Sequence, residues 1–214
     1  MADEFEQRTL VEPVEFRSHG RSLVASGVAM RYGSKSKPIG GQFREVFTPG
    51  AFTKTIAEQD VRSHNEHGGP YLGRSGNGSL VLTDTRSELG YELALPDTSA
   101  GRDAAVLLER GDIKGSSIGF RAIPAADRWS KDTDGMALRT VGEARLFVVD
   151  LVVAPAYDAS TSELALRSLE RARAAGVIGS GSSHRPSAEF ADIQTILTGV
   201  VPHRVQASKA WWSA

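Results

Sequence analysis

The chain has 214 residues, of which 40% are apolar and 24% charged, and its formal net charge at pH 7 is −1. This length is enough for one hydrophobic core with a short additional segment, and the balanced charge argues against a nucleic-acid-binding protein. The absence of cysteine excludes disulfides, thiolate metal sites and cysteine nucleophiles. No apolar run approaches the roughly 20 residues that span a membrane, and the acidic start is no signal peptide, so we expect a soluble intracellular protein.

Short strands dominate the predicted elements. Residues 1–9 are expected to be a mobile acidic tail, and the polar segment 121–139 is expected to be a surface excursion. Alternating or continuous apolar residues predict strands at 9–16, 23–32, 43–47, 80–82, 88–95, 113–120 and 145–153. A short helix is predicted at 51–58 and a clearer one at 98–110, which Thr98 or Ser99 can cap and Gly111 ends. This pattern indicates a mostly β barrel or sandwich with helices packed outside.

The character of the chain changes at Ser160. Ser160 and Glu163 form a capping box that begins a helix ending near Gly176. A Gly/Ser linker at 179–183 follows, and then apolar residues on one face of a short amphipathic helix. We therefore divide the chain into an N-terminal tail with the first strand (1–19), a main domain (20–177), and a linker with an amphipathic C-terminal tail (178–214).

Two serines lie between two glycines in the apolar run Ile113-Lys114-Gly115-Ser116-Ser117-Ile118-Gly119-Phe120. Glycines on both sides let another backbone or a substrate approach closely. A serine hydroxyl is a nucleophile only when a base removes its proton, and otherwise such serines merely pack or form turns. Ser117 is therefore a candidate nucleophile if the fold brings a base to it.

The histidines offer one candidate base and one alternative site. His19, His184 and His203 lie in turns or linkers and are expected at the surface. His67, 50 residues before Ser117, has the imidazole that general-base catalysis needs. With His64 and Glu66 it also suggests a metal site, although residues three apart on a strand point to opposite faces.

Asp150 is the one charge inside the apolar strand Arg145-Leu146-Phe147-Val148-Val149-Asp150-Leu151-Val152-Val153. An unpaired carboxylate is costly to bury, so Asp150 either faces water or has a partner. An arginine at a strand edge or dimer interface is one partner. A histidine is the other, and a carboxylate behind a catalytic histidine fixes its tautomer.

Taken together, these segments resemble the tailed-phage prohead protease family, the capsid maturation serine proteases. The matching pieces follow the family's order over roughly residues 20–165. They are Gly27-Val28-Ala29 to Tyr32; Phe43-Arg44-Glu45-Val46-Phe47-Thr48-Pro49-Gly50-Ala51-Phe52; Asn65-Glu66-His67 with Leu72-Gly73-Arg74; Gly111-Asp112-Ile113 with Ser116-Ser117-Ile118-Gly119-Phe120; and Val152 to Pro155-Ala156-Tyr157.

The resemblance implies a mostly β, α+β fold like that of the herpesvirus assembly proteases: a closed β-barrel surrounded by helices, often dimeric, here with a C-terminal helical tail. It places the nucleophile at Ser117 and the base at His67. Family members commonly carry an acidic residue and then a small polar one at the positions of Val148 and Asp150. This chain departs from that pattern, so Asp150 is assigned as the third catalytic residue, with Glu143 as the alternative.

The implied function is that of a serine endopeptidase that cleaves the scaffold segment of the major capsid protein, and itself, inside the immature capsid in the host cytoplasm. The resemblance implies a homodimer that uses no cofactor, binds no metal, nucleic acid or membrane, and works through an acyl-enzyme. Two rival hypotheses remain: a catalytically inactive scaffold or assembly protein with the protease fold, and a metal-dependent hydrolase using His64, Glu66 and His67.

Overall fold

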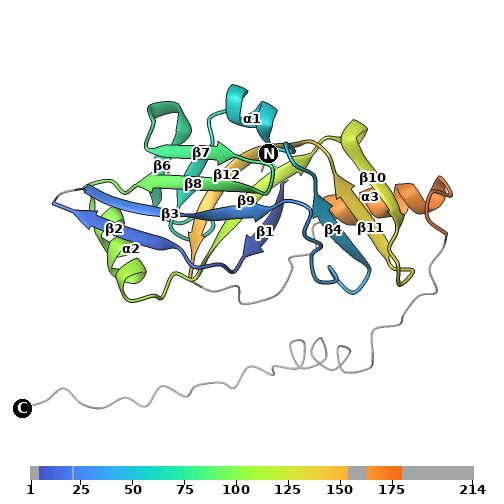
Figure 1. Ribbon diagram of the computed structural model, residues 1–214, viewed down its shortest axis with the longest axis horizontal. Helices are drawn as coiled ribbons and strands as arrows, with labels where there is room; N and C mark the ends of the chain where they lie inside the picture. Colours follow the sequence, from blue (N-terminus) through green and yellow to red (C-terminus); the bar gives the residue numbers. More distant parts are fainter. Residues whose placement is uncertain (1–4, 21, 154–162, 180–214) are drawn as a thin grey trace, which may run out of the picture. The chain divides into compact units, whose positions relative to one another are not determined.

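The structure is a computed structural model that describes residues 5–20, 22–153 and 163–179 (Figure 1). In this part of the chain, three sheets are accompanied by three α-helices: α1 (Thr53–Glu58), α2 (Ser99–Glu109) and α3 (Glu163–Ala174). The strands are β1 (Glu6–Leu10), β2 (Glu15–His19), β3 (Ser22–Arg31), β4 (Phe43–Phe47), β5 (Arg62–His64), β6 (Tyr71–Arg74), β7 (Leu80–Asp84), β8 (Glu88–Ala94), β9 (Gly115–Ala122), β10 (Asp127–Lys131), β11 (Ala137–Val141) and β12 (Ala144–Val152). None of the described helices has the length and apolar character needed to span a membrane.

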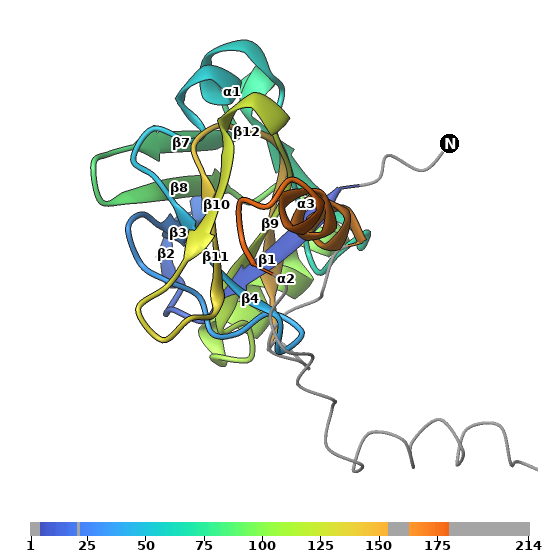
Figure 2. The same cartoon turned by 90° about the vertical axis from the view of Figure 1, so that its right-hand side faces the viewer.

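The main core lies between a five-stranded sheet, in the order β1-β9-β12-β5-β6, and a four-stranded sheet, in the order β2-β3-β8-β7. Inward-facing residues of both sheets form it, among them Ile118 and Leu151 from one and Tyr91 and Leu93 from the other. A three-stranded sheet, β10-β11-β4, lies beside them, and α3 packs on it (Figure 2). Apolar residues along one side of α3, Ala165, Leu169 and Ala172, contact Phe43 and Ile39 in this second cluster.

The mostly β, α+β class is confirmed, but the prediction of a closed barrel is wrong. The strand ladders form three separate sheets, and the described strands include open edges at β1 and β6, at β2 and β7, and at β10 and β4. Hydrogen-bond pairing from strand to strand around a full circle is what closes a barrel, and side-chain packing joins these sheets instead. The predicted C-terminal tail, 178–214, lies outside the described residues except for Ile178, which is buried beside α3, and Gly179.

The predicted acidic tail at 1–9 is also wrong, because its described part contains strand β1. β1 pairs antiparallel with β9 along its whole length, and Glu6 and Arg8 are buried. Arg8 donates to Glu6 (3.0 Å) and to Glu45 (2.7 Å). Charged side chains are rarely buried unless they are paired. The sequence of β1 therefore resembles a solvated tail, because the residues that pair with its charges are distant in the chain.

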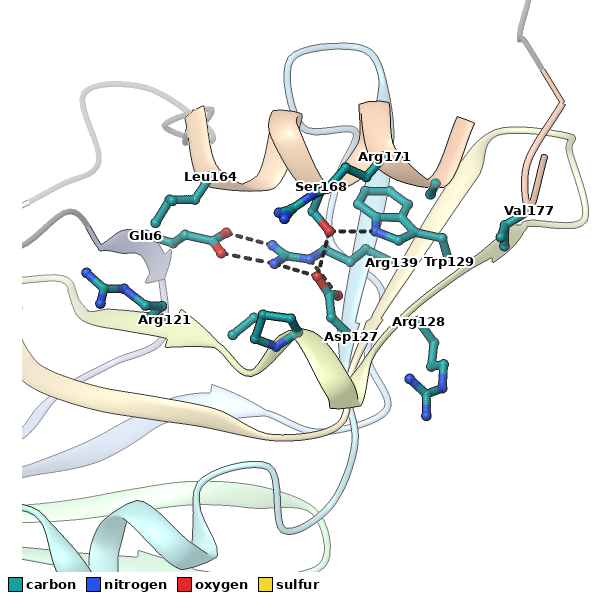
Figure 3. A pocket seen from close by; sticks show the side chains of 13 residues that line it. Glu6, Arg121, Asp127, Arg128, Trp129, Arg139, Leu164, Ser168, Arg171 and Val177 are labelled. Atoms are coloured by element: carbon teal, nitrogen blue, oxygen red, sulfur yellow. Dashed lines mark hydrogen bonds and ion pairs between the residues drawn. The ribbon is translucent and has the colours of Figure 1, made fainter. Parts of the chain in front are cut away.

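The segment 121–139, predicted as a surface excursion, instead forms the hairpin of β10 and β11 and supplies the centre of this ion network. The guanidinium of Arg139 is 2% exposed and donates to Glu6 (2.7 and 3.0 Å), Glu45 (2.9 Å) and Asp127 (2.9 and 3.1 Å). Burial alone would lower the pKa of Arg139, but the hydrogen bonds to Glu6 and Asp127 outweigh it and raise the pKa above its ordinary value. Figure 3 shows the part of this network formed by Glu6, Asp127 and Arg139 beside α3, where it lines a cavity of about 490 Å³.

Replacing Arg139 with methionine is expected to lower the free energy of unfolding by about 3–5 kcal/mol, because the carboxylates of Glu6, Glu45 and Asp127 would each lose the guanidinium that binds all three. Urea unfolding followed by circular dichroism measures this change. Arg17→Met is the matched control: the Arg17–Glu92 ion pair is about 60% exposed on both sides, so its loss should cost under about 1 kcal/mol. Equal losses in the two variants would show that the network adds no stability beyond a surface pair.

Candidate active site

Strand β9 directs its two serines to opposite faces of the five-stranded sheet. Successive side chains of a strand alternate, and Ser116 points inward with Ile118 and Phe120. The hydroxyl of Ser116 lies 2.7 Å from that of Tyr91, whose pKa burial raises to about 12. Ser116 is therefore a core residue, and only Ser117 faces the outside of the sheet.

Ser117 is part of a row of polar residues that crosses the outer face. Thr9 on β1 and Asp150 on β12 are its direct partners in the two antiparallel ladders, so all three side chains lie on one face. On the far side of β12, β5 runs parallel to it, with Arg62 paired to Val148 and Asn65 bridged to Leu151. His64 lies between those two points and extends the row to a fourth strand.

Asp150 is 1% exposed, and its carboxylate binds two histidines of the described structure. Its Oδ1 accepts the backbone N–H of His64 (2.9 Å) and lies 3.0 Å from Nδ1 of the same residue. Its Oδ2 lies 3.0 Å from Nδ1 of His67. A buried carboxylate with three hydrogen bonds is a stable arrangement, and of the two partners considered from the sequence, the structure shows histidine rather than arginine.

A tight turn brings His67 back to the sheet that His64 belongs to. β5 ends at His64, Glu66 adopts a left-handed conformation (φ 61°), and the backbone of Asn65 bonds to that of Pro70. The turn needs glycine at Gly69, where a Cβ would lie 1.8 Å from the carbonyl oxygen of Asn65. The expectation that His64 and His67 point to opposite faces is therefore wrong, since the strand has ended before His67.

The residues of the metal hypothesis do not converge on one point. The carboxylate of Glu66 accepts the backbone N–H of Val153 (2.6 Å) and anchors the turn to the end of β12. Within the described ranges, no group of three or more His, Cys, Asp or Glu side chains is arranged to hold a metal ion. The two imidazoles are each directed at Asp150 through Nδ1, which leaves both Nε2 atoms without a hydrogen bond to any described residue.

The alternative third residue, Glu143, is remote from the histidines. It precedes β12, whereas Asp150 lies near the other end of that strand, about 20 Å away at the usual rise per residue. The side chain of Glu143 is 39% exposed and faces Lys54 at 3.8 Å. The structure thus groups Asp150, and not Glu143, with His67.

The hydroxyl of Ser117 has two partners among the described residues, and both belong to β1. It donates to the carbonyl oxygen of Arg8 (3.2 Å) and accepts from the hydroxyl of Thr9 (3.1 Å). Attack on a substrate would require the Ser117 proton to turn from Arg8 toward an imidazole. Catalytic hydrogen bonds are often unformed before substrate binds.

Comparisons with known proteins identify a family and a similar solved structure. Residues 11–174 match the family model described as caudovirus prohead serine protease. Among solved structures, the chain is similar to the bacteriophage T4 capsid assembly protease, gp21, with 14% identity and a TM-score of 0.49 over 71% of this chain and 98% of that one. No curated protein matches significantly. The family match spans more than half of the chain and contains every residue from β2 to α3, and the chain belongs to the caudovirus prohead serine protease family.

Proposed function

We propose that this protein is a serine endopeptidase that cleaves the scaffold segment of the major capsid protein, and itself, inside the immature capsid in the host cytoplasm. Family membership supports the reaction class. The observation that carries the assignment of residues is the row on the outer face, in which Ser117 lies beside Asp150 and Asp150 binds Nδ1 of His67.

The proposed mechanism uses His67 as the base and Asp150 as its partner. Nε2 of His67 takes the proton from Ser117 Oγ, which attacks the peptide carbonyl and forms a C–O bond. The same proton then passes to the leaving amine as the C–N bond breaks, and water hydrolyses the acyl-enzyme. Asp150 accepts the Nδ1–H of His67 throughout, which fixes the tautomer and stabilises the imidazolium.

An inactive assembly protein with the same fold is the second candidate, and Val148 is the observation behind it. The family commonly has an acidic residue at this position. Here Val148 lies on the same face as Asp150, two residue pairs further along the β9–β12 ladder. Asp150 contacts both histidines directly, so its carboxylate can take the role of the acidic residue that is missing at Val148. We therefore favour the active enzyme.

Co-expression with the phage's major capsid protein tests the function. We expect mass spectrometry to show a truncated capsid protein and a shortened protease, and self-association of the protease as a homodimer in sedimentation analysis. A fluorophosphonate should block cleavage and add its mass to the peptide that contains Ser117, whereas a chelator should have no effect. Intact capsid protein in assembled shells, with Ser117 unlabelled, would favour the inactive assembly protein.

A further inference from the structure

His64 has no place in the mechanism above, yet it binds Asp150 more extensively than His67 does. Its backbone N–H and its imidazole both reach Oδ1 of Asp150, at 2.9 and 3.0 Å. The ring of Tyr71 meets that of His64 edge-on, with 5.8 Å between centroids. The side chains of His64 and His67 are 20% and 31% exposed, so both imidazoles can exchange protons with water.

The strand order favours His67 over His64 as the base. β5 and β9 lie on opposite sides of β12, and neighbouring strands are about 4.8 Å apart, so about 10 Å separates the backbones of His64 and Ser117. The imidazole of His64 is directed at Asp150, which lies between it and Ser117. His67 lies beyond the end of β5, in the turn, and is not held at this spacing.

Asp150 thus shares one negative charge between two imidazoles. Each ring donates its Nδ1–H to a carboxylate oxygen, and each can accept a proton at Nε2. The carboxylate is thereby held from two sides, and its orientation toward His67 depends on the contact that His64 makes on the other side.

We propose that His64 is a positioning residue, which fixes the carboxylate of Asp150 for His67. This inference rests on the proposed function. The backbone N–H and the imidazole of His64 both bind Oδ1 of Asp150, which leaves Oδ2 for Nδ1 of His67.

The rate of phosphonylation of Ser117 by a fluorophosphonate tests the proposal without knowledge of the cleavage site. We expect His64→Ala to lower this rate about tenfold to a hundredfold, because the carboxylate of Asp150 would lose the imidazole that orients it. His64→Asn can still donate a side-chain N–H to Asp150. It should therefore recover most of the rate, which a purely packing role of His64 would not predict.

The outcomes separate this proposal from the proposed function. A wild-type rate in His64→Ala, or a rate in His64→Asn as low as that in His64→Ala, would overturn the positioning role. Loss of the rate in His64→Ala with a normal rate in His67→Ala would make His64 the base, and so also overturn it. Absence of labelling in the wild type would instead reject the protease mechanism. If His64→Ala does not fold, His64→Leu takes its place, and equal rates in His64→Leu and His64→Asn overturn the proposal.

Discussion

Replacement of Ser117 with alanine is expected to lower the rate of peptide-bond cleavage by about 10⁶-fold, the loss usual when a serine protease loses its nucleophile. Ser117 is the serine that shares the outer face with Asp150, and no other described serine in β9 does. The variant removes one hydroxyl and its hydrogen bonds with Thr9 and the carbonyl of Arg8, so we expect the fold to stay intact. Mass spectrometry of the co-expressed capsid protein measures the residual cleavage.

Ser116→Ala is the matched control, since it removes the same hydroxyl one residue away and on the opposite face. Cleavage should persist, while the unpaired hydroxyl of Tyr91 should lower the free energy of unfolding by about 1–3 kcal/mol. The two variants therefore separate chemistry from stability. Cleavage by Ser117→Ala, or loss of cleavage in a folded Ser116→Ala protein, would show that Ser117 is not the nucleophile.

The sequence predicted those parts of the fold that local chemistry determines. The helix predicted at 98–110 is α2, and the side chain of Thr98 accepts the backbone N–H of Gly101 at its start. The strand predicted at 43–47 is β4. Apolar periodicity and a capping hydroxyl act over a few residues, so they are readable without the rest of the chain.

The missed features depend on contacts between distant residues. β1 looks like an acidic tail because Glu6 and Arg8 are charged, and their burial depends on partners from other strands, among them Glu45 and Arg139. Closure of a barrel likewise depends on pairing between strands that are far apart in the chain, and local patterns do not specify it.

The same distinction applies to the active site. Ser117, His67 and Asp150 were assigned with the help of the family resemblance, and the structure adds the contact of Asp150 with His67. His64 is a second partner of Asp150 that the sequence analysis does not name, and its expectation that His64 and His67 point to opposite faces fails because β5 ends at His64. The signal was present in Gly68-Gly69-Pro70, which requires a turn and so frees His67 from the strand's alternation.

Asp150→Asn is expected to lower the cleavage rate by about 10⁴-fold with little change in the fold, the loss seen when an asparagine replaces the carboxylate of a catalytic triad. An asparagine offers one acceptor oxygen and one amino group, whereas Asp150 accepts from both histidines. With the oxygen retained by His64, whose backbone N–H also binds it, the amino group would face His67. That imidazole would then carry its proton on Nε2, where it cannot accept the proton of Ser117.

Glu143→Gln is the matched control, because it changes the same functional group at the other end of β12. Among the described residues, its side chain has only the exposed contact with Lys54, so the cleavage rate should stay within about twofold of wild type, as expected for a surface pair.

Nitrogen-15 NMR of the two histidines reports the tautomer directly, and Asp150→Asn should move the His67 proton from Nδ1 to Nε2. A slow Asp150→Asn enzyme with an unchanged His67 tautomer would mean that Asp150 acts through its charge alone. A slow Glu143→Gln enzyme together with a fast Asp150→Asn enzyme would identify Glu143, and not Asp150, as the third catalytic residue.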